Sequence, residues 1–275
     1  PDPGGQIRLC AKSERRKDML GIVDWRMQQC SKKNVKFNFN VVAENQDVLD
    51  EKPNTIIIAT GGMPNLELFE TKQDLENVYT SWDILSGDVK LSDNILIYDE
   101  AGDHTGMQSA EFAIKEGATV EFMTPDRLIS SEIMGMNLTP YLKNLQNKKI
   151  TYSIAKRLLD VSIKGNKLNA VIGSDYVENF KYNSSYDQVF LNYGIKPVDD
   201  LYFSLVPYSK NKGEIDYNKF INGEEQDIIK SDNNKFNLFR IGDAVSSRNI
   251  HAAIYDALRL VINLWKVNFL SKVKK

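Results

Sequence analysis

One segment near the middle of the chain constrains the fold more than any other. Residues Asn94–Tyr98 form an apolar run typical of a buried strand, and a second such run follows at Ala118–Met123. A loop at Asp99–Gly106 and a helical stretch at Met107–Glu116 separate the two runs. A strand, a helix and a strand in so short a segment predict a βαβ unit with a right-handed crossover and parallel strands. The chain is therefore expected to have an α/β fold.

Composition and charge exclude several classes of function. Lys and Arg number 35 against 37 Asp and Glu, and this formal net charge of −2 leaves no basic stripe for nucleic acid. The apolar runs, such as 55–59, are too short to cross a bilayer. Two cysteines and two histidines cannot supply a four-thiolate cluster, so no metal site is expected in this chain. Free thiols are typical of a reducing compartment, and the protein is expected to be cytoplasmic.

Periodicity and turn residues predict the other elements. Helices are expected at Ser13–Ser31, Thr139–Gln146 and Asn249–Lys266. Strands are expected at Val35–Val42, Asn54–Thr60, Gln188–Asn192 and Phe236–Ile241. A hairpin is expected at Leu158–Ile172, with its turn at 164–167.

Two of the expected strands end in glycines and polar residues, a pattern typical of the edge of a cofactor site. Strand 54–60 runs into Gly61 and Gly62, which let backbone approach a cofactor; the alternative is an ordinary strand-to-turn exit. Gly242 and Asp243 precede the helix that begins near Asn249. This order suits a polyol or phosphate ligand, and the alternative is a capped helix start.

An internal echo connects two of the turns. Gly61–Pro64 and Gly194–Pro197 both follow an apolar strand and share the pattern Gly-x-x-Pro. Two stacked dinucleotide-binding domains often carry such an echo, and chance is the alternative explanation.

Six sequence blocks occur in the order that one enzyme family uses. They are Pro3–Gln6, Arg16–Trp25, Ala59–Gly62, Ser81–Gly87, Met134–Pro140 and Ile241–Ala244. Together they resemble the C-terminal region of the NADH:flavin oxidoreductase (old yellow enzyme) class. The similarity is greatest to the trimethylamine dehydrogenase and dimethylglycine or N-methylproline demethylase branch, and smaller to the 2,4-dienoyl-CoA reductases.

The resemblance implies two Rossmann-like domains of the flavin-disulfide-reductase type, the first lacking its N-terminal βαβ unit. A partial FAD-type domain would comprise residues 1–88 and 207–275, and a degenerate NAD-type domain with a β-meander would be inserted at 89–206. The chain opens at Pro1 without an initiator Met, so it is expected to be a piece of a longer protein.

The family also implies the cofactors and partners. FAD or ADP would bind this module, while FMN, a 4Fe-4S cluster and the substrate pocket would belong to an N-terminal TIM barrel of the same polypeptide. An electron-transfer flavoprotein is a possible partner, and the parent enzyme is expected to be a homo-oligomer. The cofactor-binding residues implied here are Gly4, Gly5, Gln6, Thr60, Gly61, Gly62, Gly242, Asp243, His251 and Ala252. No catalytic residue is expected, and the isolated chain is expected to be inactive.

The second dinucleotide loop departs from its fingerprint. A nicotinamide-binding fold requires Gly-x-Gly-x-x-Gly after the strand, and here residues 101–106 keep only the third glycine, Gly106, in register. Asp103 replaces the second glycine, and Asp99 and Glu100 add negative charge. Like charges a few ångströms apart cost about 1–4 kcal/mol at effective dielectrics of roughly 80 to 20. NAD(P)H is therefore expected to bind poorly. His104, in the same loop, is expected to cap the following helix.

The resemblance implies an enzyme that oxidatively demethylates a small N-methylated amine or amino acid, and the altered second loop favours passing electrons to a protein acceptor. An NAD(P)H-dependent enoate or 2,4-dienoyl-CoA reductase is the first alternative, and an intact second glycine loop would favour it. A non-catalytic nucleotide-binding or assembly fragment is the second.

Overall fold

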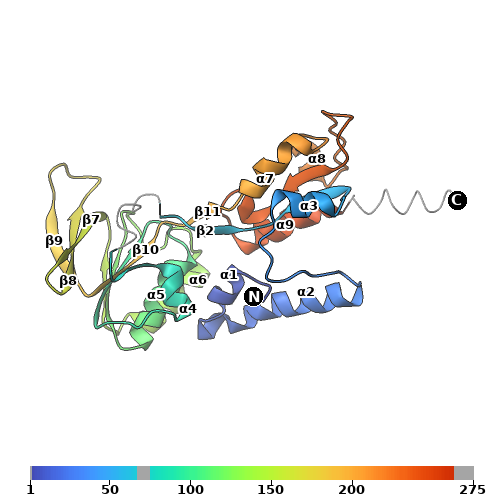
Figure 1. The fold of residues 1–275 in the computed structure, drawn as a ribbon. Helices are drawn as coiled ribbons and strands as arrows, with labels where there is room; N and C mark the ends of the chain where they lie inside the picture. Colours follow the sequence, from blue (N-terminus) through green and yellow to red (C-terminus); the bar gives the residue numbers. More distant parts are fainter. Residues whose placement is uncertain (1, 67–74, 263–275) are drawn as a thin grey trace. The chain divides into compact units, whose positions relative to one another are not determined.

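A computed structural model describes residues 2–66 and 75–262 of the chain (Figure 1). The chain divides into two compact units. The sheet unit comprises Pro1–Phe37 and Pro64–Gly194, and the C-terminal unit comprises Asn38–Met63 and Ile195–Lys275. Within the described residues, none of the helices combines the length and apolar character that crossing a bilayer requires.

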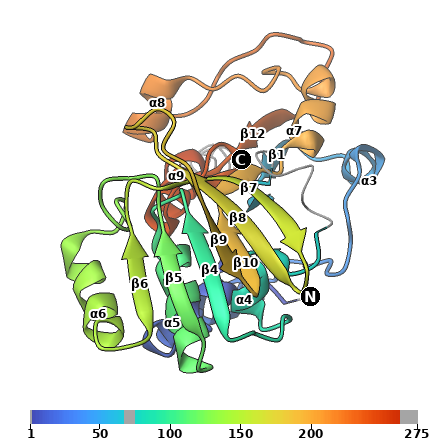
Figure 2. The same ribbon diagram turned by 90° about the vertical axis from the view of Figure 1, so that its left-hand side faces the viewer.

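A parallel five-stranded sheet forms the centre of the sheet unit. Its strands, in spatial order, are β3 (Val78–Thr80), β10 (Gln188–Asn192), β4 (Asn94–Asp99), β5 (Thr119–Met123) and β6 (Ile150–Ser153). Figure 2 looks onto this sheet. The parallel pairing of β4 with β5 confirms the predicted βαβ unit and the α/β fold class.

The sheet is covered on both faces, which explains why its strands are apolar almost throughout. Ile95 and Ile97 of β4 pack into a cluster with helices α4 (Ser81–Ser86), α5 (His104–Lys115) and α6 (Gly135–Leu145). Leu96 and Tyr98 point the other way and pack against a second, antiparallel sheet. The alternation follows from the two-residue period of a strand.

The antiparallel sheet contains β7 (Arg157–Lys164), β8 (Lys167–Gly173) and β9 (Tyr182–Tyr186). The predicted hairpin is confirmed, because Lys164 and Lys167 are register partners across its turn. Gly165 supplies a φ of 64° in that turn, a conformation that glycine adopts at little cost.

The domain boundaries expected from the sequence differ from the division into compact units. Residues 64–88 belong to the sheet unit because β3 pairs with β10, and α4 packs against α5. Residues 1–37 also belong to it, as α1 (Gln6–Cys10), the 3-10 helix η1 (Glu14–Met19) and α2 (Leu20–Lys32). Conversely, residues 195–206 lie in the C-terminal unit. Contacts across distant segments set these boundaries, and composition along the chain does not reveal them.

The predicted strand at Val35–Val42 is wrong, because the structure has no strand there. None of the described strands pairs with this segment, and Val42 is 92% exposed. Alternating apolar residues form a strand only where a partner and a buried face are available. The predicted helix at Ser13–Ser31 begins as a 3-10 turn and continues as α2.

The C-terminal unit is built on two parallel strands, β1 (Thr55–Ile58) and β12 (Asn237–Arg240). Their apolar residues pack with α7 (Asp200–Leu205) and with residues of α3 (Asn45–Asp50). The unit also contains η3 (Val206–Tyr208), α8 (Tyr217–Asn222), η4 (Gly242–Ala244) and α9 (Ile250–Val261). Both predicted strands are confirmed, as is the start of the final helix; its predicted end at 263–266 lies outside the described residues.

The two Gly-x-x-Pro turns meet in space. β2 (Gly62–Pro64) and β11 (Ile195–Pro197) pair with each other, at two of the three points where the chain passes between the units. Gly62 is required here, because an added Cβ would lie 2.7 Å from the Lys196 carbonyl oxygen. The echo in the sequence therefore corresponds to a pair of matching crossovers.

Replacing Leu96 by Ala tests the double-sided core. Leu96 is wholly buried in β4, so the truncation should lower the free energy of unfolding by about 2–5 kcal/mol. Leu128→Ala is the control, because Leu128 is 70% exposed and should change that energy by less than about 0.5 kcal/mol. Urea unfolding followed by circular dichroism measures both, and equal losses would contradict the layered arrangement.

Candidate nucleotide sites

The C-terminal unit gathers most of the expected cofactor residues at one edge. Ile58 and Arg240 are register partners in parallel strands, so Thr60–Gly62 and Gly242–Asp243 leave the sheet at the same side. In α/β proteins, ligands bind outside the carboxyl ends of parallel strands. His251 and Ala252 belong to the first turn of α9, which follows this edge in the chain.

The Gly242–Asp243 turn is held by two carboxylates. Gly242 has a φ of 61°, and its backbone N–H donates to Asp256 Oδ2 at 3.0 Å. Asp256 is buried on α9 and forms an ion pair with Arg248. Asp243 Oδ1 accepts from the Arg248 backbone N–H at 3.1 Å. Asp256 of α9 therefore helps to fix the turn, a positioning role that the sequence analysis missed.

The surroundings of Gly61 fit a group that approaches the backbone closely. Gly61 has a φ of 74°, and an added Cβ there would meet nothing within 4 Å. Thr60 is exposed and donates a hydrogen bond from Oγ1 to the Val198 carbonyl. Asn249 caps α9 by accepting from Ala252 N–H at 3.0 Å, and His251 is exposed beside it. An open glycine edge beside a helix start suits a nucleotide such as FAD or ADP.

Gly4, Gly5 and Gln6 belong to the sheet unit, whereas the other expected cofactor residues belong to the C-terminal unit. Gly4 has a φ of 121°, and an added Cβ would lie 3.0 Å from Val23 Cγ2. Gly5 precedes α1 with a φ of 45°. A local turn thus accounts for both glycines.

A second candidate site lies where the order of the parallel sheet switches. β5, the next strand along the chain, lies on one side of β4, and β10 lies on its other side. Parallel α/β sheets usually bind ligands at such a switch in strand order. Asp99 ends β4 and is the register partner of Asn192, which ends β10. Asn192 Nδ2 donates to Asp99 Oδ1 at 2.8 Å and to Asp103 Oδ1 at 3.1 Å.

Asp99 is fully buried in this crevice. Its Oδ1 also accepts from Gly102 N–H at 3.2 Å, and its Oδ2 has no hydrogen-bond partner among the described residues. Burial, followed by the charge of Asp103, raises the pKa of Asp99 to about 8. The carboxyl group therefore keeps its proton at neutral pH.

These carboxyl groups occupy the place that a pyrophosphate takes in a dinucleotide-binding loop. An added Cβ on Gly106, in the first turn of α5, would lie 2.7 Å from Asp99 Cγ. Asp103 caps α5, because its Oδ1 accepts from Thr105 N–H at 2.8 Å. A pyrophosphate would need the same helix start and the same space. The loop is thus filled by the side chains of Asp99 and Asp103. The carboxyl group of Asp103 already caps the positive end of the α5 dipole.

His104 is not the cap of α5, contrary to the expectation; Asp103 has that role because its side chain reaches the first turn. The His104 ring lies 2.8 Å from Arg16 Nη2 and 3.2 Å from the Tyr141 hydroxyl. Burial, then the Arg16 charge, lowers the pKa of His104 to about 4. His104 is therefore a neutral, packed imidazole at physiological pH.

Comparison with known proteins finds related sequences. No protein-family model matches the chain. It is 50% identical over 260 residues to a probable N-methylproline demethylase of Rhizobium meliloti (strain 1021), a match that covers 94% of this chain. It is 32% identical over 266 residues to an N,N-dimethylglycine/sarcosine dehydrogenase of Chromohalobacter salexigens, again over 94% of this chain. The chain is thus related in sequence to these oxidoreductases over nearly its whole length. It spans 38% of the length of each of these relatives.

Solved structures bear out the fold. The chain matches 2-naphthoyl-CoA reductase with a TM-score of 0.73 at 20% identity, over 94% of this chain and 34% of that one. It matches the thioredoxin reductase of Lactococcus lactis with a TM-score of 0.56 at 18% identity, over 77% of this chain and 65% of that one. The α/β fold found in dinucleotide-binding proteins of the thioredoxin-reductase type is therefore confirmed for this chain.

Asp99→Asn tests the buried carboxyl group. The pKa of Asp99 is about 8 in the folded protein, against an ordinary value of 3.8. Between these values the native state binds more protons than the unfolded state, so the free energy of unfolding falls as pH rises. The contribution of Asp99 to the free energy of unfolding should fall by up to about 1.4 kcal/mol per pH unit. Asparagine keeps the acceptor oxygen and removes this slope.

Urea titrations at several pH values between about 5 and about 8 measure the effect. Asp88→Asn is the matched control, since Asp88 is exposed and should leave the slope unchanged. Parallel pH profiles for the wild type and Asp99→Asn would show that Asp99 ionises normally.

Proposed function

We propose that this chain is the nucleotide-binding and electron-transfer-associated part of a larger FMN and iron–sulfur oxidoreductase. The parent enzyme would oxidatively demethylate a small N-methylated amine or amino acid. The identity of 50% over nearly the whole chain to a probable N-methylproline demethylase is the observation that carries this proposal. The substrate and FMN would be bound by an N-terminal TIM barrel of the same polypeptide.

In this proposal the C-terminal unit holds FAD or ADP. Thr60 and Gly61 would contact the nucleotide through the backbone, and Gly242–Asp243 with the start of α9 would receive its polar groups. A flavin bound there would carry electrons between the substrate-oxidising centre and an external acceptor. The residues of this chain would orient the nucleotide, while the chemistry of the N-methyl group takes place elsewhere.

The proposed reaction balances in two steps. The N-methyl carbon loses a C–H bond and two electrons as a hydride equivalent, which leaves an iminium ion. Water then adds to this ion, and the C–N bond breaks to release formaldehyde and the demethylated amine. The two electrons must leave the enzyme, and an electron-transfer flavoprotein is the acceptor we propose.

The filled loop at α5 favours a protein acceptor over a nicotinamide. In this proposal Asp99 and Asp103 take the space at the start of α5 that the pyrophosphate of NAD(P)H would need, and Asn192 hydrogen-bonds to both. The alternative function, an NAD(P)H-dependent enoate or dienoyl-CoA reductase, needs that space to be free. The second alternative is a non-catalytic nucleotide-binding or assembly fragment. It predicts that even a longer form of the protein does not turn over an amine.

Turnover of N-methylated amines by the full-length protein tests the proposed reaction. N-methylproline, sarcosine and dimethylglycine should each be offered anaerobically, with the flavin absorbance and released formaldehyde measured. At least one should bleach the flavin and yield one formaldehyde per two electrons, because the methyl carbon is the site of oxidation. Bleaching by none of them, together with reoxidation by an enoate substrate, would favour the reductase.

Gly61→Ala tests the nucleotide edge of the C-terminal unit. Gly87→Ala is a closely matched control, because Gly87 has a φ of 81° against 74° and its added Cβ also meets nothing within 4 Å. Both changes should cost about 1–2 kcal/mol of stability through the left-handed backbone. Only Gly61→Ala should reduce the FAD or ADP retained by the purified full-length protein, measured after heat release. Equal nucleotide content in the two variants would remove Gly61 from the site.

A further inference from the structure

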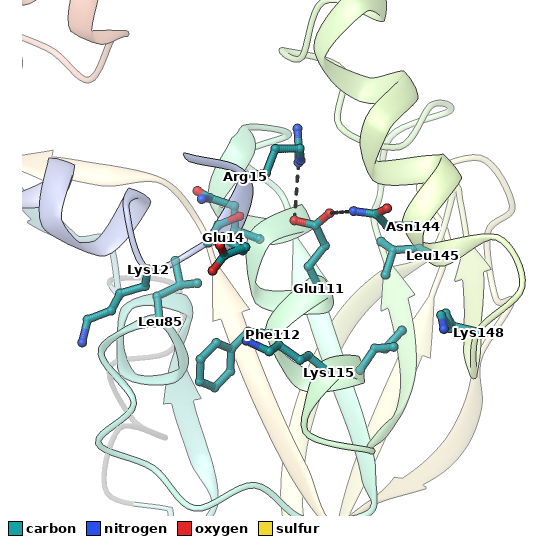
Figure 3. A pocket seen from close by; sticks show the side chains of 13 residues that line it. Lys12, Glu14, Arg15, Leu85, Glu111, Phe112, Lys115, Asn144, Leu145 and Lys148 are labelled. Carbon is teal, nitrogen blue, oxygen red and sulfur yellow. Dashed lines mark hydrogen bonds and ion pairs between the residues drawn. The ribbon is translucent and has the colours of Figure 1, made fainter. Parts of the chain in front are cut away.

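The sheet unit has a cavity that belongs to neither nucleotide site. Its volume is about 570 Å³, and it lies between residues 12–15 and the helices α5 and α6 (Figure 3). Leu85, Phe112 and Leu145 give it an apolar lining. The cavity is lined by residues of α5, by residues at the end of α6 and by residues 12–15. The filled loop lies elsewhere, at the carboxyl ends of β4 and β10.

One wall of the cavity is preformed by a closed set of polar contacts. Glu111 Oε2 lies 3.4 Å from Arg15 Nη2, and Glu111 Oε1 accepts from Asn144 Nδ2 at 3.1 Å. The Arg15 guanidinium also lies 3.9 Å from the centre of the Tyr141 ring. Arg15 and Glu111 thus neutralise each other, and their contacts hold the wall in place without a ligand.

The remaining charge around the cavity is positive. Lys12, Lys115 and Lys148 line it, and none of them forms an ion pair with any residue that the structure describes. Glu14 is the other acidic residue of the lining, and it pairs with Lys17 at 2.7 Å. The bond to Lys17 lowers the pKa of Glu14 most, and Lys115 adds to that effect through space.

We propose that this cavity binds a small organic anion with an apolar body. Its acid group would lie beside Lys115, with Lys12 and Lys148 at opposite ends of the cavity (Figure 3), and its body would pack on Phe112 and Leu145. The volume falls in the range of about 300–1,000 Å³ that small-molecule pockets occupy, and such pockets combine apolar walls with a few charged groups. The surplus of lysines selects an anion over a cation or a neutral molecule.

Two ligands with the same tail and opposite charge test the proposal. Octanoate and octyltrimethylammonium are titrated into the protein, and heat is measured by isothermal calorimetry. Octanoate should bind saturably at one site, and octyltrimethylammonium at least about tenfold more weakly, because like charges would meet at the lysines. Equal affinity of the two, or no binding of octanoate, would overturn the proposal, since the cavity would then not select an anion.

Charge reversal identifies where octanoate binds. The double variant Lys115→Glu with Lys148→Glu should weaken octanoate binding at least about fivefold, as expected for two exposed charge contacts. The control is Lys143→Glu with Lys149→Glu. Lys143 lies in the last turn of α6 as Lys115 does in that of α5, Lys149 follows Lys148, and neither control residue lines the cavity.

Circular dichroism should give the same spectrum for both double variants. Equal affinities in the two would place octanoate outside this cavity and overturn the proposal.

Discussion

The side chain of Asn192 makes the contacts on which the carboxyl-terminal edge of the parallel sheet depends. It ends β10, and its Nδ2 group donates to both Asp99 and Asp103, while its Oδ1 accepts from the buried hydroxyl of Ser81 at 3.3 Å. One side chain thereby connects two neighbouring strands, the start of α4 and the cap of α5. These hydrogen bonds matter because a buried polar group left without a partner costs about 1–3 kcal/mol.

This contact makes the two Rossmann-like units chemically different. In the sheet unit, the crevice at the strand ends is closed by carboxyl groups of the chain itself, one of them protonated at neutral pH. In the C-terminal unit, Gly61 leaves the backbone open at the corresponding edge. The same fold therefore presents one filled and one open strand edge, and the open one is the edge at which we propose a nucleotide binds.

Most of the fold could be predicted from the sequence where a local pattern determines the structure. The βαβ unit, the hairpin at 158–172 and the strands of the C-terminal unit all have apolar runs bounded by turn residues. The segment 35–42 has the same alternation and forms no strand, because pairing depends on a partner that local sequence does not reveal. The limits of the two compact units likewise depend on contacts between distant segments.

The candidate sites were predictable in part. Asp103 could be identified because it replaces a glycine of a known fingerprint, and the two glycine turns because each follows an apolar strand. The roles of Asn192 and Asp256 could not. Asn192 meets Asp99 across 93 positions of the chain through strand register, and Asp256 meets Gly242 only once α9 packs beside its turn.

Equilibrium dialysis of the protein against NADH and NADPH tests the central claim most directly, because it reports whether the crevice at β4 and β10 admits a dinucleotide. The filled loop predicts no saturable binding of either nucleotide at concentrations up to the millimolar range. Saturable binding at micromolar concentration, abolished by a bulky substitution at Gly102, would contradict the claim. It would mean that Asp99 and Asp103 move aside for a pyrophosphate.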